Sequence, residues 1–244
     1  MPETLAWTRL LNHLFGGPVT VLLHSVGVLP KYPAAPINDA YALELLIAGL
    51  LLGFFVLVRL TLSVEKPASA QQIAEIIHEF VGGQAHQIIG HGYERFQSFV
   101  TVILLFVLGC NLLGLFPRID TPTSFPVVPL GIAVATFVYY HFHGFREQGF
   151  LGYLGHFAGP IWWIAPLLFP IEIISHCARV MSLTIRLYAN MFASDLVTLV
   201  FFSLVPLGVP VIFLGLHAMV SIIQAFVFML LAMIYLSQAV SHEH

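Results

Sequence analysis

Uninterrupted apolar stretches of about 20 residues recur along the chain, and they limit its fold more than any other feature. About 20 residues of α-helix cross the roughly 30 Å hydrocarbon core of a membrane. Inside that core every backbone N–H and C=O group must be bonded within the protein, which leaves only helices or a closed barrel. The alternation of apolar and polar residues typical of barrel strands does not occur in this sequence. The pattern therefore predicts an all-α integral membrane protein.

The composition agrees with a membrane protein. Of the 244 residues, 59% are hydrophobic and 9% are charged, whereas a soluble domain has roughly 25% charged residues. The net charge of −3 offers no basic surface for nucleic acid. Cys110 and Cys177 both lie in apolar stretches, a pattern that indicates neither a disulfide framework nor a metal site. We expect no cofactor, no metal and no nucleic-acid partner.

Five membrane-crossing helices are expected. They cover residues 43–62, 96–116, 126–142, 161–204 and 209–240. The fourth helix, even counted from Pro170, has about 35 residues and a length of about 50 Å, which exceeds the membrane thickness. Its partner has a similar excess. We predict that these two helices form a steeply tilted antiparallel hairpin around a turn that contains Gly208.

Three segments are expected outside the hydrocarbon core. Residues 1–40 contain several glycines and prolines, so their apolar part (19–29) is expected at the membrane interface and not across the membrane. Residues 69–91 place isoleucines on one face and polar residues on the other, behind a Ser69–Gln72 capping box, which predicts an amphipathic helix on the membrane surface. The polar connection 141–160 is also expected outside.

The basic residues predict the orientation. Five crossings place the termini on opposite sides, and the basic residues divide into two groups of four and three: Arg59, Lys66, Arg95 and Arg146 against Arg9, Lys31 and Arg118. The positive-inside rule favours the larger group as cytoplasmic. The N-terminus is then external and the C-terminus cytoplasmic.

A polar stripe runs along the first helix of the hairpin. Its members follow at spacings of three or four residues: Glu172, Ser175, Arg179, Ser182, Arg186 and Asn190. At about 100° per residue they fall within an arc of about 80°. A central arginine costs about 2.5–3.5 kcal/mol to insert, so this face must meet protein, water or a counter-charge. An ion pair with Glu172 or snorkelling explains Arg179 equally well, whereas Arg186 has no opposite charge within a turn.

The second helix of the hairpin carries matching polar residues. A turn near residue 207 brings residues whose numbers sum to about 414 to the same depth. Asn190 then lies level with Gln224, and Asp195 lies level with His217. A carboxylate beside an imidazole can form a proton relay, although a structural hydrogen-bonded pair fits the same pattern. His217, Ser221 and Gln224 share one face, and Asp195 points away from the arginine stripe.

Three other classes of membrane protein fit the sequence less well. A secondary transporter predicts internal repeats, which we do not find between the chain halves. A zinc protease requires H-E-x-x-H, but Gly82 replaces the second histidine in "HEFVG". A haem protein is suggested by the 12 histidines, yet most lie outside the expected spans, and His141 and His143 are two residues apart and cannot face one haem.

The stretch "SLTIRLYANMFASDL" is preceded by "NLLGLFP" and followed by "HAMVSIIQAFVFMLLAMIYLSQA". These three stretches resemble subunit a of the membrane sector of bacterial F-type rotary ATP synthases, in order from about residue 44 onward. Arg186 matches the family's essential arginine, Asn190 and Gln224 its polar partners, and Asp195 with His217 its proton-access pair, although many members have glutamate at position 195. The resemblance also assigns further positions: Glu172, Ser175 and Ser182 to the opposite channel, and Asn111 to a polar site of the "NLLGL" span.

The resemblance implies a stator subunit with an ion-conducting hairpin (161–240). We expect a single membrane domain (1–244), whose segment 1–40 is external as the basic residues indicate. Such a stator conducts protons through two half-channels to and from a rotating ring of c subunits and couples this flow to ATP synthesis. Na⁺ remains an alternative ion. The implied partners are the c ring, peripheral-stalk b subunits and lipid of the bacterial inner membrane, and no catalytic nucleotide site is expected in this chain.

Overall fold

The computed structural model describes residues 5–25, 27, 35–64, 67–116, 119–158, 165–204 and 208–240. Their regular structure is helical throughout. Seven α-helices and two short 3₁₀ helices follow one another: α1 (Ala6–Ser25), α2 (Asp39–Leu60), α3 (Ser69–Ile89), α4 (Glu94–Leu112), η1 (Leu113–Leu115), η2 (Pro122–Ser124), α5 (Val127–Ala158), α6 (Ala165–Leu204) and α7 (Val209–Val240).

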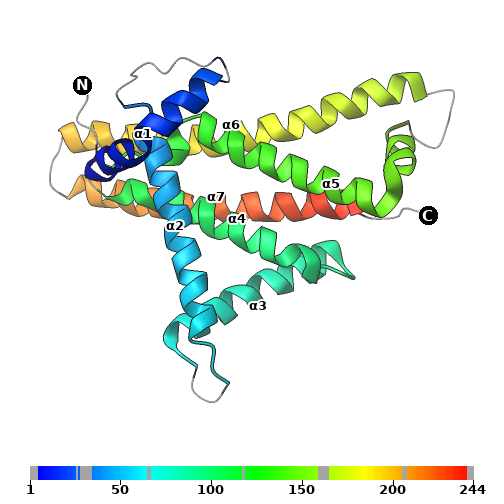
Figure 1. The fold of residues 1–244 in the computed structure, drawn as a ribbon, viewed down its shortest axis with the longest axis horizontal. Helices are drawn as coiled ribbons and strands as arrows, with labels where there is room; N and C mark the ends of the chain where they lie inside the picture. Colours follow the sequence, from blue (N-terminus) through cyan, green and yellow to red (C-terminus); the bar gives the residue numbers. More distant parts are fainter. Residues whose placement is uncertain are drawn as a thin grey trace.

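Five of these helices are long and apolar enough to cross a membrane, as predicted. The qualifying segments are Asp39–Leu60, Glu94–Leu115, Val127–Gly149, Pro166–Leu204 and Pro210–Val240. Helices α5, α6 and α7 extend along the long axis of the molecule, whereas α2 runs across this direction (Figure 1). With 40 residues, α6 is about 60 Å long, so it cannot cross a membrane upright without leaving it. A strong tilt of the α6–α7 hairpin relative to α2 accommodates this length.

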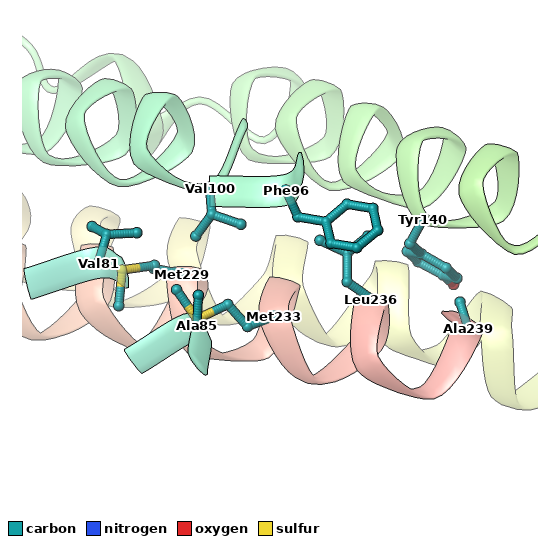
Figure 2. Packing of buried hydrophobic residues seen from close by; sticks show 9 residues of the cluster. All are labelled: Val81, Ala85, Phe96, Val100, Tyr140, Met229, Met233, Leu236 and Ala239. Atoms are coloured by element: carbon teal, nitrogen blue, oxygen red, sulfur yellow. The ribbon is translucent and has the colours of Figure 1, made fainter. Parts of the chain in front are cut away.

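A hydrophobic core forms where α3, α4, α5 and α7 meet. Figure 2 shows its buried residues, which come from all four helices: Val81, Ala85, Phe96, Val100, Tyr140, Met229, Met233, Leu236 and Ala239. A second cluster joins α6 to α7, because Leu183, Leu187 and Met191 pack against Ala225 and Phe228. These three α6 residues recur every four positions and form a buried face directly beside the polar stripe. The second cluster therefore fixes how the stripe is presented.

Helix α3 differs in one detail from the sequence-based prediction. The capping box is wrong: the N-cap residue is Ala68, which makes no side-chain cap bond, so Ser69 already belongs to the first turn. Along the helix, Val81 and Ala85 are fully buried against the core, whereas Ile76 remains 66% exposed. The helix thus uses one face for packing and leaves an apolar strip uncovered beside it.

The N-terminal segment is more regular than predicted. Gly16, Gly17 and Pro18 lie inside the 20-residue helix α1, which is not among the candidate membrane spans in the described residues. The Asn12 side chain bonds both backbone groups of Ile37, at 3.0 Å each, and the Trp7 indole N–H donates to the Ala42 carbonyl at 2.8 Å. These bonds attach α1 to the beginning of α2.

Most of the polar segment 141–160, which was expected as a connection outside the hydrocarbon core, is helical. Helix α5 continues to Ala158 across a kink at Gly149, where φ is 72°, a value that favours glycine. The polar side chains bond to neighbouring helices: Arg95 on α4 pairs with Glu147 at 2.5 Å, and the Gln148 amide donates to the Ala239 carbonyl at 3.1 Å. Glu147 and Gln148 thus make contacts between helices, although the polar composition of the segment suggested a connection.

Candidate functional site

The polar stripe of α6 is in large part uncovered. Ser182, Arg186 and Asn190 are exposed, and Glu172, Ser175 and Arg179 are partly buried. The Arg186 guanidinium makes one contact within the described residues, a 3.4 Å hydrogen bond from Nη2 to the Ser182 hydroxyl. A permanent positive charge therefore lies on the surface of a membrane-spanning helix with no carboxylate of the described chain beside it.

Helix α7 supports the backbone at this point. The side-chain amide of Gln224 is buried and donates to the Arg186 carbonyl at 3.3 Å. Gln224 was predicted to lie level with Asn190, one turn further along α6. Asn190 instead lines a cleft of about 220 Å³ between α6 and α7, together with Ser194 and Thr198. The Gln224 amide therefore reaches the backbone one turn before Asn190.

The predicted contact between Asp195 and His217 is present. Asp195 Oδ1 lies 3.4 Å from His217 Nδ1 and accepts a 2.9 Å hydrogen bond from the Thr121 hydroxyl. The Ser194 hydroxyl also lies 2.9 Å from His217 Nδ1, and Nε2 lies 3.2 Å from the Asn111 carbonyl oxygen. Both imidazole nitrogens are therefore engaged in a ring that is 1% exposed.

Asn111 connects this pair to the rest of the protein. Its side chain is buried, donates to the Ser221 carbonyl at 3.4 Å and accepts a 2.6 Å bond from the Thr123 hydroxyl. Asn111 belongs to α4, Thr123 to η2 and Ser221 to α7. The cluster around Asp195 is consequently assembled from four separate elements of the chain.

Sequence reasoning missed the hydroxyl groups of this cluster. Thr121 and Thr123 lie in and beside a three-residue 3₁₀ helix, where no periodicity marks them. Their signal is the polar run "TPTS" soon after the "NLLGL" span. Gly114 was also missed, and a Cβ atom there would collide with the Thr121 hydroxyl and lie 3.0 Å from His217 Nε2. Only glycine lets these groups approach so closely.

A second carboxylate–imidazole pair lies near the beginning of α6. Glu172 Oε1 is 3.4 Å from His176 Nε2, and His176 Nδ1 is 3.0 Å from the Tyr140 hydroxyl on α5. Arg179, for which an ion pair with Glu172 was one explanation, instead stacks over the Tyr235 ring with Cζ 5.1 Å from the centroid. His176 and Tyr140 had no place in the sequence-based site.

No metal site competes with this interpretation in the part of the chain that is described. Groups of three or more histidine, cysteine, aspartate or glutamate residues do not occur there at metal-binding distances. Cys110 and Cys177 are both free thiols. Several polar side chains of the hairpin contact one another across and along its two helices.

Comparison with known proteins agrees with this geometry. The family described as ATP synthase A chain matches residues 42–237. ATP synthase subunit a of Koribacter versatilis (strain Ellin345) is 52% identical over 244 residues, which cover 100% of both chains. ATP synthase subunit a of Solibacter usitatus (strain Ellin6076) is 42% identical over 235 residues, 96% of this chain and 100% of that protein. The chain therefore belongs to the ATP synthase A chain family, as an all-helical, multi-pass membrane subunit.

Proposed function

We propose that this chain is the stator that carries protons to and from a rotating ring of c subunits in an F-type ATP synthase. The observation that carries this proposal is Arg186, an exposed guanidinium in the middle of an apolar helix. Isolated, such a charge is costly in a membrane. It becomes favourable when another subunit presents a carboxylate to it.

Arg186 can order the movement of protons by electrostatics alone. A guanidinium stays protonated and favours the ionised form of an arriving carboxylate. Its positive charge also opposes the direct passage of a proton along the surface of α6. The arriving carboxylate must then release its proton on one side of Arg186 and bind another proton on the other side. To do so, this carboxylate has to move past Arg186. The membrane potential biases this movement by about 2.3 kcal/mol per charge per 100 mV.

Two polar routes lead to Arg186 from opposite ends of α6. The first contains Asp195, His217 and Asn111 and reaches the stripe through Asn190 and Gln224. The second follows the stripe itself, in a sequence of three residues: Ser182, Ser175 and Glu172. We propose that these routes are the two half-channels, with residues 161–240 as the ion-conducting hairpin.

The remaining assignments follow from the same proposal. The exposed stripe meets the c ring, and peripheral-stalk b subunits and lipid cover other faces of the helices. The proposed ion is H⁺, because carboxylate and imidazole groups are suited to proton relays, and Na⁺ is the alternative. ATP chemistry takes place in other subunits. The protein lies in the bacterial inner membrane with its N-terminus external and its C-terminus cytoplasmic, as the basic residues indicate.

Replacing Arg186 tests the proposal. We expect Arg186→Ala to abolish ATP-driven proton pumping in inverted membrane vesicles that contain normal amounts of the assembled enzyme. Arg186→Lys should also fail largely, because lysine lacks the planar fork and can lose its proton when desolvated. Arg179→Ala is the matched control, since Arg179 lies on the same stripe but stacks on Tyr235, and it should retain most pumping. Near-normal pumping by Arg186→Ala would refute the mechanism.

A further inference from the structure

Two carboxylate–imidazole pairs lie on either side of Arg186, and only one of them belongs to the site derived above. The pair of Asp195 and His217 has an oxygen–nitrogen separation of 3.4 Å, and so has the pair of Glu172 and His176. Along α6, Asp195 is about 13 Å beyond Arg186, and Glu172 is about 21 Å before it. Each proposed half-channel thus has one carboxylate with an imidazole against it.

The surroundings of His176 give its two ring nitrogens different tasks. Its side chain is 11% exposed, whereas that of Glu172 is 35% exposed, so the pair bridges a buried and a more accessible position. When the Tyr140 hydroxyl donates to Nδ1, the neutral ring must carry its hydrogen on Nε2. That N–H then points to the Glu172 carboxylate, which is the arrangement that stabilises an ionised carboxylate.

Other titratable and charged groups surround the ring. On α5, the His141 ring lies 4.8 Å from that of His176, centroid to centroid. On α7, the ring centroid of Tyr235 lies 6.1 Å from that of Tyr140. The guanidinium of Arg179 on α6 lies over the Tyr235 ring. His176 is therefore packed among ring and guanidinium groups from three helices, and Glu172 is the carboxylate that contacts it.

We propose that His176 is a proton-holding residue of the second half-channel, acting with Glu172 and oriented by Tyr140. A proton that arrives converts the pair from a carboxylate and a neutral imidazole to a net-neutral pair. The same proton then leaves to the c-ring carboxylate that stands near Arg186, or to water on the other side. Histidine suits this task because it gains and loses a proton near neutral pH. The inference rests on the proposed function, because it adds a carrier to one of its two channels.

The test uses the whole ATP synthase in inverted vesicles, with pH varied on one side at a time. His176→Gln keeps a polar side chain but cannot take up a proton. We expect its pumping rate to fall about tenfold, less than the roughly 100-fold or more typical of a positioned acid or base in a chemical step, because water carries part of the flux. The fall should depend on pH on one side only, and His217→Gln should respond to pH on the other side. His143→Gln is the matched control on α5, since its Nδ1 bonds the Tyr139 carbonyl of its own helix, and it should behave as wild type.

Three results would overturn the proposal: wild-type rates of His176→Gln at every pH, equal sensitivity to pH on both sides, or sensitivity on the same side as His217→Gln. If His176→Gln does not assemble, Tyr140→Phe decides the question, because it removes only the hydroxyl that orients the ring. A Tyr140→Phe enzyme with a wild-type pH profile refutes the proposal. An inactive Arg186→Ala enzyme beside a normal His176→Gln enzyme rejects this inference alone, whereas normal pumping by Arg186→Ala rejects the proposed function as well.

Discussion

Gly114→Ala is expected to damage the cluster around Asp195 from a position that carries no functional group. The added methyl group would collide with the Thr121 hydroxyl and lie 3.0 and 3.1 Å from two atoms of the His217 ring. Thr121 is β-branched and has few alternative rotamers, so it can move away only by giving up its 2.9 Å bond to Asp195. Overpacking costs about 1–3 kcal/mol, and losing a hydrogen bond to a charged group costs about 1.5–3 kcal/mol.

The expected loss of stability is therefore about 2.5–6 kcal/mol, together with slower pumping. Thermal inactivation of the purified enzyme and ATP-driven pumping measure the two effects. Gly131→Ala is the control, since a Cβ there meets nothing within 4 Å and alanine favours the helix by about 0.5–1 kcal/mol. Adding Thr121→Ala to Gly114→Ala should recover part of the stability but not the pumping, because Asp195 still lacks its donor. Wild-type stability and pumping of Gly114→Ala would refute the steric argument.

Two further predictions concern the access pair and the orientation. Alanine at Asp195 or His217 should slow pumping by at least about tenfold. The double variant Asp195→His with His217→Asp should recover part of that loss. Strictly additive losses in a double-mutant cycle would reject a proton shared by the two residues. A reporter that is active on only one side of the membrane should give opposite results at the N-terminus and after the tail "SHEH", and equal results at both ends would show that the number of crossings is not five.

Several features of this protein follow from the sequence through helix geometry and the membrane alone. The five spans, the limits of α7 at Val209 and Val240, and the uncovered stripe around Arg186 are all present as predicted. The reason is physical: in hydrocarbon the backbone has to be helical, and in a helix spacings of three and four residues place side chains on one face. Both rules act within one segment and need no knowledge of neighbouring segments.

The Asp195–His217 contact was predicted from the sequence, but the other contacts between helices were decided only by the tertiary structure. Shifting α7 by one turn moves each of its residues about 5.4 Å along α6 and leaves the periodicity of both helices unchanged. Leu187 and Met191 pack with Ala225 and Phe228 in the observed register, and in this register the Gln224 amide bonds the Arg186 carbonyl.

The same reason applies to partners that come from distant segments. Thr121 reaches Asp195 across 74 positions in the sequence, and Tyr140 reaches His176 across 36. Nothing in the local pattern of either segment specifies these pairs, because they depend on how η2 and α5 pack against α6. The sequence alone determined which helix carries the charge and that Asp195 lies beside His217, and the packing of the helices determined which further hydroxyl and imidazole groups lie close to the two carboxylates.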